Sequence, residues 1–236
     1  MEKVFLLNVG NTHTRYGMCE DGKIISSGSH DTDKLENLEI PKNTDVAVAT
    51  VVPDVMKIFT KYRAYQVTTD CKTDIDLSLV EKEKLGADRF ANLVALSELS
   101  ELPAAVIDCG TALSVEVVNK EKQFIGGIIA PGRSLQRKTL HSYTAQLPYI
   151  EVKSGQTYKT FGCTTEDSII LGTDLGIIGA TKEFLNIVKK ELKVDKLNVY
   201  VTGGDSELLI KYIPEIKPVS VNFTLYGVLK LWRDNK

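Results

Sequence analysis

The chain has 236 residues, of which 43% are hydrophobic and 25% charged, and its formal net charge is −2 at pH 7. This length allows one large core or two smaller lobes, and the charge gives no general attraction to nucleic acid or an acidic membrane. No apolar run approaches the roughly 20 residues of a membrane span, and the start is not that of a signal peptide. The four scattered cysteines form no CxxC pair, so we interpret them as reduced thiols of a cytoplasmic protein.

Taken in chain order, the first half of the sequence predicts mostly strands. Strands are expected over the apolar run that ends at Leu6-Leu7-Asn8-Val9 and over Thr14–Cys19, Lys23–Ser27, Asp45–Val52 and Ala64–Thr68. After Pro53, Asp54 is expected to cap a short helix through Thr60. The stretch Asp70–Lys84 is polar and irregular, whereas Asp88–Leu99 places its apolar residues on one helical face, which predicts a helix.

The second half predicts longer helices between strands. Further strands are expected at Val106–Asp108, Ser114–Val118, Phe124–Ala130 and Leu197–Thr202, and helices at Gly132–His141, Thr165–Leu192 and Leu225–Trp232. In the longest helix Gly172, Gly176 and Gly179 recur on one side, which predicts close backbone approach to another element. The basic residues within Arg133–Lys138 are too few for a nucleic-acid patch, and we interpret them as a solvated helix face.

One turn pattern appears twice, in Leu6–Thr12 and in Val106–Ala112. Each time an apolar strand ends in Asn or Asp, an apolar residue and a glycine follow, and then Asn-Thr in the first copy or Thr in the second. Either copy alone would fit an ordinary hairpin. Glycine lets a ligand approach the backbone, and the following N–H groups and hydroxyl can bind phosphate oxygens. Because a strand, a polar turn and another strand follow both copies, we expect two duplicated α/β lobes, 1–103 and 104–236, whose turns face a shared cleft.

Three turns in this order, Asn8–Thr12, Asp108–Ala112 and Thr202–Gly204, resemble the superfamily of acetate kinase, sugar kinases, Hsp70 and actin, with its ribonuclease H-like lobes. Within that superfamily the chain resembles type III pantothenate kinase over nearly its whole length. Seven segments carry the resemblance in order: the NxGNT start, Val51-Val52-Pro53, Gly86-Ala87-Asp88-Arg89, Asp108-Cys109-Gly110-Thr111-Ala112, Gly126-Gly127-Ile128-Ile129-Ala130-Pro131-Gly132, Thr144-Ala145-Gln146-Leu147-Pro148, and Thr165 with Gly172.

The resemblance implies a substrate site in the Gly-Ala-Asp-Arg segment. Asp88 would be the general base for the substrate hydroxyl, and Arg89, with the backbone of Gly86 and Ala87, would bind the carboxylate of pantothenate. Thr165 would reach the substrate from across a dimer interface. Taken alone, the Asp-Arg pair would fit a helix cap followed by a solvated cation, and Thr165 also suits a helix start.

The resemblance also implies an ATP site. Thr111 would touch ATP, and Asp108 would hold a monovalent cation, K⁺ or NH₄⁺, beside ATP-bound Mg²⁺. The first ATP loop would consist of Asn8, Val9, Gly10, Asn11, Thr12, His13, Thr14 and Arg15. Cys109 lies in the second turn with no histidine near it in sequence, which favours a small apolar residue behind the loop over a nucleophile.

One position departs from the family, which normally has Asp where this chain has Asn8. Asn keeps the shape but loses the charge that attracts Mg²⁺ or its water shell. The chain is then either a working kinase that relies on ATP-borne Mg²⁺ and Asp108, or a weakened one. The implied activity is ATP-dependent phosphorylation of pantothenate, the first step of coenzyme A biosynthesis, by a homodimer. A non-catalytic regulator, such as a transcription accessory factor, and another small-molecule kinase of the superfamily are the alternatives.

Overall fold

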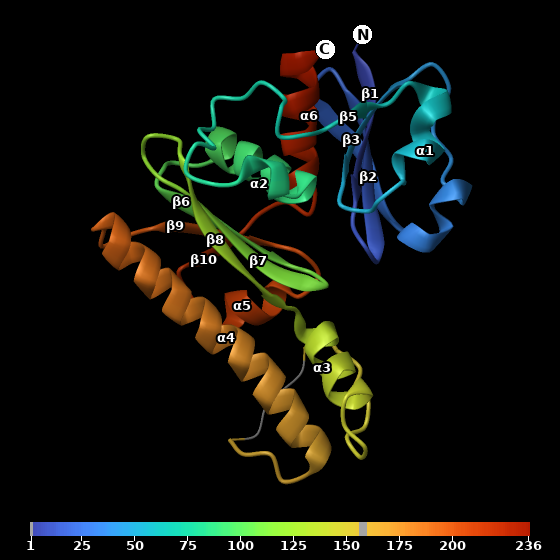
Figure 1. Cartoon of the computed structure of the whole chain (residues 1–236). Helices are drawn as coiled ribbons and strands as arrows, with labels where there is room; N and C mark the ends of the chain where they lie inside the picture. Colours follow the sequence, from blue (N-terminus) through green and yellow to red (C-terminus); the bar gives the residue numbers. More distant parts are fainter. Residues whose placement is uncertain (1, 156–159) are drawn as a thin grey trace. The chain divides into compact units, whose positions relative to one another are not determined.

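Two five-stranded sheets carry the fold of this computed structural model, which describes residues 2–155 and 160–236 (Figure 1). The first sheet has the order β3-β2-β1-β4-β5, with β1 (Lys3–Val9), β2 (His13–Glu20), β3 (Lys23–Asp31), β4 (Asp45–Thr50) and β5 (Tyr65–Gln66). The second has the order β10-β9-β6-β7-β8, with β6 (Ala104–Cys109), β7 (Ala112–Val118), β8 (Phe124–Pro131), β9 (Asn198–Thr202) and β10 (Ile216–Pro218). Lowering each strand number of the second sheet by five gives the order of the first sheet read from its other edge, so the strand order is duplicated.

The helices extend this duplication. They are α1 (Met56–Phe59), α2 (Ala87–Leu99), α3 (Arg133–Ser142), α4 (Thr165–Leu192), α5 (Ser206–Tyr212) and α6 (Phe223–Asn235), with short 3-10 segments η1 (Thr32–Asn37), η2 (Thr60–Tyr62) and η3 (Lys82–Lys84). In each half a short helix, α1 or α5, joins the fourth strand to the fifth, and a longer one, α2 or α6, follows. The halves differ between their third and fourth strands, where the first has η1 and the second has α3 and α4.

In space the chain divides into two compact units that are not consecutive in sequence. The first consists of Met1–Ala104, Glu116–Gly126 and Ser220–Lys236, and the second of Ala105–Val115 and Gly127–Val219. Helix α6 therefore belongs to the first unit, where it lies beside α2 and against β1 (Figure 1). A Cβ at Gly227 would lie 1.9 Å from the carbonyl oxygen of Ala91, so these two helices touch backbone to backbone. The boundary at residue 104 stays a prediction about the duplicated lobes.

The register of β1 decides which side chains of the first turn meet the helices. β1 runs antiparallel to β2 and parallel to β4. Leu6 pairs with Gly17, and a Cβ at Gly17 would lie 3.1 Å from Leu225 Cδ1 of α6. Because side chains alternate along a strand, Asn8 lies on the same α6-facing side as Leu6. The opposite side forms a buried cluster of Phe5, Leu7, Val9, Leu35, Val46, Val48, Val55 and Phe59.

Most predicted elements are present, and α4 covers the predicted residues without change. Asp54 was the wrong choice as a helix cap: its φ of +63° lies in the left-handed region, and α1 begins two residues later, after Val55. The strand predicted at Ala64–Thr68 is reduced to the two residues of β5. The sequence prediction missed α5 and β10, which have only seven and three residues and so show little periodicity.

Among the described residues, the glycines of α4 approach no other backbone, so the predicted close approach is not made within this part of the chain. A Cβ at Gly172, Gly176 or Gly179 would have no heavy atom within 4 Å among the described residues. Leu175 between them is 49% exposed. This side of α4 is therefore open. Although α4 has 28 residues, no helix in the described part of the chain is long and apolar enough to cross a bilayer.

Candidate active site

The first glycine turn is a tight loop at the carboxyl end of β1. The N–H of Gly10 donates to the carbonyl oxygen of His13 at 3.1 Å, and a Cβ at Gly10 would lie 3.0 Å from that oxygen. The hydroxyl of Thr32 donates to the Gly10 carbonyl at 2.8 Å and lies 3.0 Å from the Thr14 hydroxyl. Asn11 and its two successors are exposed at the tip. The residues predicted as the first ATP loop thus form one braced turn whose tip is open to solvent.

Asn8 and Arg15 face each other across β1 and β2 at the base of this turn. The Nε and Nη2 atoms of Arg15 lie 3.4 and 3.3 Å from Oδ1 of Asn222, just before α6. Among the described residues the buried Oδ1 of Asn8 has no hydrogen-bond partner. A buried acceptor of this kind calls for a donor from outside the chain, such as a water molecule of a hydrated cation.

The Gly-Ala-Asp-Arg segment begins α2 at the same edge of the first sheet. Gly86 is the N-cap of α2, with extended backbone. A Cβ at Gly86 would lie 3.2 Å from Cγ1 of Val51, and the N–H of Val51 donates to the carbonyl of Val9 at 3.2 Å. The structure therefore places the predicted substrate segment near the first turn through Val51, which directly follows β4, the parallel neighbour of β1.

Asp88 is the second residue of α2, and it is not the helix cap. Its Oδ1 accepts a hydrogen bond from the N–H of Arg89 at 2.7 Å. Burial raises the pKa of the Asp88 carboxyl, and the N–H and charge of Arg89 oppose this rise only in part. A helix N-terminus favours an ionised carboxylate, but at Asp88 desolvation is the larger effect and the pKa rises. A carboxylate with a raised pKa is the stronger proton acceptor once it is ionised.

Arg89 contacts a carboxylate that the sequence reasoning missed. Its Nε donates to Oε1 of Glu116 at 2.6 Å, and the Phe124 ring centre lies 6.0 Å from its Cζ. The Glu116 side chain is fully buried, whereas that of Arg89 is 20% exposed. The available signal was a single acidic residue in the middle of the apolar strand β7.

In the second unit the predicted second and third turns meet. Gly132 fits only without a side chain, because a Cβ there would lie 2.2 Å from the carbonyl oxygen of Gly110. Gly203 has a φ of +94°, and its Cβ would lie 2.4 Å from the carbonyl oxygen of Cys109. The N–H of Asp205 donates to that same oxygen at 3.1 Å. Backbone from three segments therefore packs together around the second turn.

The predicted ligands of the second turn differ in accessibility. Asp108, near the end of β6, is half-buried, and Thr111 is exposed at the turn. Cys109 between them is 4% exposed, and burial, with the charges of Asp108 and Asp205, raises the pKa of its thiol. This protonated, enclosed thiol supports the interpretation of Cys109 as a small apolar residue rather than a nucleophile.

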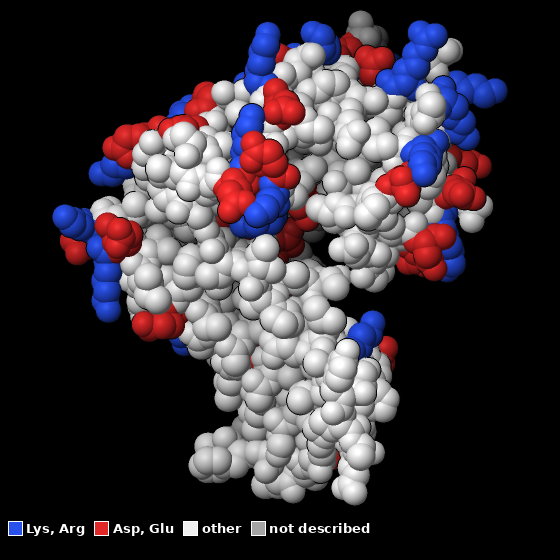
Figure 2. Space-filling view, viewed as in Figure 1, with Lys and Arg blue, Asp and Glu red and all other residues white. Residues whose placement is uncertain are grey.

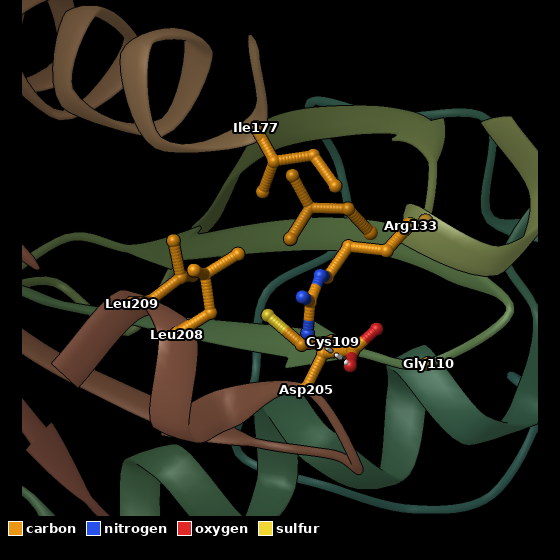
Figure 3. Close-up of a pocket in the computed structure, with 9 residues that line it drawn as sticks. Cys109, Gly110, Arg133, Ile177, Asp205, Leu208 and Leu209 are labelled. Carbon is orange, nitrogen blue, oxygen red and sulfur yellow. Dashed lines mark hydrogen bonds and ion pairs between the residues drawn. The ribbon is translucent and has the colours of Figure 1, made fainter. Parts of the chain in front are cut away.

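Arg133 and Arg137 form a buried ion-pair cluster, so their interpretation as a solvated face was wrong. Arg133 donates through Nε and Nη2 to the two carboxylate oxygens of Asp174, at 2.9 and 2.7 Å, and through Nη1 to Asp205 at 3.0 Å. Arg137 donates through Nη2 to Asp174 at 2.9 Å. Figure 3 shows the Arg133 side chain ending beside Asp205 and Cys109. Of the three basic residues in Arg133–Lys138, only Lys138 is exposed. Because Asp174 lies about forty positions further along the chain, no local pattern indicated the cluster.

Thr165 lines a groove between α3 and the beginning of α4. Thr164 caps the helix by accepting a hydrogen bond from the N–H of Asp167 at 3.1 Å, so Thr165 is not the cap. The groove has a volume of ≈ 560 Å³, and its apolar lining includes Pro131, Leu140, Leu147 and Ile169. Over α3 and the N-terminal half of α4, the face in Figure 2 carries few charged side chains.

Solved structures of other proteins have the same fold. A conserved protein assigned to a Baf family of transcriptional activators, from Campylobacter jejuni, superposes with a TM-score of 0.70 at 17% identity, covering 97% of both chains. A ROK family glucokinase from Streptomyces griseus superposes with a TM-score of 0.55 at 12% identity, covering 97% of this chain and 98% of that one. The predicted α/β fold with two duplicated lobes is thereby confirmed.

Sequence comparison is more specific. A type III pantothenate kinase from Methylacidiphilum infernorum is 31% identical over 235 residues, which cover 95% of this chain and 86% of the relative. The family model of type III pantothenate kinase matches residues 4–187, which include the first two glycine turns, the Gly-Ala-Asp-Arg segment and Thr165. This chain therefore belongs to the type III pantothenate kinase family.

Proposed function

We propose that this chain is a transferase that moves the γ-phosphoryl group of ATP to the primary hydroxyl of pantothenate, giving ADP and 4′-phosphopantothenate, the first step of coenzyme A biosynthesis. The observation that carries the proposal is the pair at the start of α2. Asp88 is a half-buried carboxyl with a raised pKa, and Arg89 beside it is a guanidinium whose contact to Glu116 uses Nε alone. Family membership supplies the substrate class.

Asp88 is the general base in this proposal. The hydroxyl oxygen of pantothenate forms the new bond to phosphorus as the bond to the β–γ bridging oxygen breaks. The hydroxyl proton passes to Asp88. In a loose transition state this transfer comes late, so the carboxylate first orients the hydroxyl by a hydrogen bond.

Arg89 binds the other end of the substrate. Its guanidinium pairs with the pantothenate carboxylate, and the backbone of Gly86 and Ala87 completes the pocket. A guanidinium suits this task because it offers parallel N–H groups to both carboxylate oxygens.

The glycine turns hold the phosphates of ATP in this proposal. Residues Asn8, Val9, Gly10, Asn11, Thr12, His13, Thr14 and Arg15 form the first ATP loop, and Thr111 contributes from the second. Within the described residues no three His, Cys, Asp or Glu side chains are grouped to hold a metal ion. Mg²⁺ bound mainly through substrate phosphates requires only one or two protein oxygens, and the partnerless Oδ1 of Asn8 is such an acceptor. Mg²⁺ would spread the charge of the γ-phosphate, and Asp108 would hold the monovalent cation, K⁺ or NH₄⁺.

We also propose a cytoplasmic homodimer that forms along α4. The open glycine side of this helix and the half-exposed Leu175 are suited to a second copy of the same helix. Thr165 would then reach the substrate of the partner. The four cysteines are all free thiols, as the cytoplasm favours.

A coupled kinase assay tests the proposal directly. Purified protein is given ATP, Mg²⁺, K⁺ and pantothenate, and ADP release is compared among wild type, Asp88→Asn and Asp33→Asn, a matched change at an exposed aspartate of the same unit. We expect wild type and Asp33→Asn to have the same turnover rate. The rate of Asp88→Asn is expected to be about 10²–10⁴-fold lower. A folded wild type that transfers no phosphate to pantothenate would contradict the proposal and favour the regulatory alternative.

A further inference from the structure

We infer that Glu116 is a positioning residue for the substrate carboxylate: it holds Arg89 by Nε so that both terminal amino groups remain for the ligand. The inference rests on the proposed function, because it assigns Arg89 to the pantothenate carboxylate. It adds a residue from β7, distant in sequence from the Gly-Ala-Asp-Arg segment, to the same site.

The geometry of the contact supports separate roles for Nε, which binds Glu116, and for the two terminal nitrogens of Arg89. Nε of Arg89 lies 2.6 Å from Oε1 of Glu116. Among the described residues no hydrogen bond or ion pair involves Nη1 or Nη2 of Arg89. A guanidinium has five N–H donors, and a single acceptor at Nε leaves the edge formed by the two terminal nitrogens for a bidentate carboxylate.

The surroundings restrict the guanidinium further. The Phe124 ring of β8 lies 6.0 Å from Cζ of Arg89, within the range of a cation–π contact. Glu116 and Phe124 belong to the segment Glu116–Gly126, which is part of the same compact unit as α2. Arg89 is thus held by a buried carboxylate and by an aromatic ring before any substrate arrives. A side chain fixed in advance loses less conformational freedom on binding, which favours affinity.

Stability alone does not account for Glu116. A fully buried carboxylate is costly to desolvate, and an apolar residue of similar volume often stabilises a fold as well or better. The flanking residues of β7 are apolar, so the strand offers an apolar alternative at this position. The specific gain from a glutamate here is the fixed direction of the guanidinium.

The closing experiment compares two substrates that differ only in the group Arg89 is proposed to bind. Pantothenate carries a carboxylate, and its alcohol analogue pantothenol carries a neutral hydroxymethyl group in the same place. We expect Glu116→Gln to raise KM for pantothenate about tenfold, because the ion pair that holds Arg89 becomes a weaker hydrogen bond to a neutral amide, with KM for ATP and for pantothenol within about twofold. Glu2→Gln is the matched control, since Glu2 pairs with Nε of Arg233 at 2.7 Å far from α2 in sequence.

Further variants separate positioning from a general structural role. Glu116→Asp keeps the charge but draws the carboxylate back from Nε, and we expect the same selective effect at smaller size. In an Arg89→Gln background, Glu116→Gln is expected to add almost nothing, because both changes act through one guanidinium. An equal loss with both substrates, or no loss with either, would overturn the inference.

Direct binding keeps this result distinct from the fate of the proposed function. Calorimetric titration measures Kd for pantothenate in wild type and Glu116→Gln without any turnover. Binding by wild type that weakens in the variant supports the inference even where no phosphate is transferred. Absence of pantothenate binding to folded wild type overturns the inference and the proposed function together.

Discussion

Two arginines follow glycines at helix starts in this molecule, and their surroundings are opposite. Arg89 of α2 uses one nitrogen on one carboxylate, and its side chain is 20% exposed. Arg133 of α3 uses three nitrogens on two carboxylates, and its side chain is 6% exposed. Both follow a glycine N-cap with extended backbone, Gly86 and Gly132.

The difference is the one expected between an arginine proposed to bind a ligand and a structural one. Each nitrogen of the Arg133 guanidinium already donates to a carboxylate within the chain, whereas a guanidinium held by Nε alone keeps both terminal nitrogens for a bidentate ligand. Arg133 instead ties three elements together, since Asp174 belongs to α4 and Asp205 precedes α5 beside the second turn. Under the proposed function, the same residue type serves packing in one unit and substrate recognition in the other.

The largest expected effect concerns the buried carboxylate of the structural cluster. Asp174→Asn leaves Arg133 and Arg137 with much less negative charge in a buried place, and we expect a loss of about 3–5 kcal/mol in the free energy of unfolding. Urea denaturation measures it, with Glu116→Gln as the counterpart in the other unit. Because Arg89 is partly hydrated, the Glu116→Gln loss is expected to be clearly smaller. Equal losses would remove the distinction between the two arginines.

Arginine-to-lysine changes test the same comparison through kinetics. Arg89→Lys keeps the charge but loses the fork, and we expect KM for pantothenate to rise about 10–100-fold with a much smaller change for ATP. Arg133→Lys is the matched change, expected to lower the melting temperature and to leave KM for pantothenate within about twofold. A similar rise in KM for both substrates in Arg89→Lys would mean that Arg89 supports the fold or the phosphates instead.

Local sequence patterns predicted part of the fold and of the candidate site, but not the contacts of these two arginines. The duplicated turns and the Gly-Ala-Asp-Arg segment are local patterns, and the strands and helices around them were predicted because a strand alternates and a helix repeats. Glu116 and Asp174 were missed because their partners lie 27 and about forty residues away, so only the tertiary fold joins them. Arg133 was misjudged for the same reason: a basic residue without a local partner looks like a solvated one.

The glycines show a second limit. Gly132 and Gly203 contact backbone from distant segments, while Gly172, Gly176 and Gly179 face open space, although all were equally visible in the sequence. A glycine in the sequence can mean that a side chain would clash or that none is required, and only the packing in the structure distinguishes the two cases.

Asn8→Asp is expected to have a moderate effect, and it tests whether the two glycine turns differ in charge for a functional reason. The first turn carries a neutral Asn8 where the second carries Asp108. In Asn8→Asp a carboxylate replaces the amide whose Oδ1 has no partner among the described residues, and its charge would attract hydrated Mg²⁺. We expect turnover to rise about tenfold and KM for Mg²⁺ to fall. Asn11→Asp, at the exposed tip of the same turn, is the control for added charge. Unchanged turnover in Asn8→Asp would show that the first loop does not depend on that charge.

The smallest expected effect is a pH dependence of Asp88, and its sign follows from burial. Because burial raises the pKa of Asp88, the acid limb of kcat/KM is expected above the ordinary aspartate value of about 3.9. The folded state holds this proton more tightly than the unfolded state does, so ionisation of Asp88 costs stability as pH rises through the folded-state pKa. Asp88→Asn removes that cost: its melting temperature should match wild type near pH 4 and equal or exceed it at pH 8. The charge of Arg89 lowers the pKa of Asp88, and Glu116 holds Arg89 in place. The difference in melting temperature between wild type and Asp88→Asn is therefore expected to change when both proteins also carry Glu116→Gln. A melting temperature for Asp88→Asn that falls below wild type by the same amount at both pH values would show that hydrogen bonding, and not desolvation, dominates at Asp88.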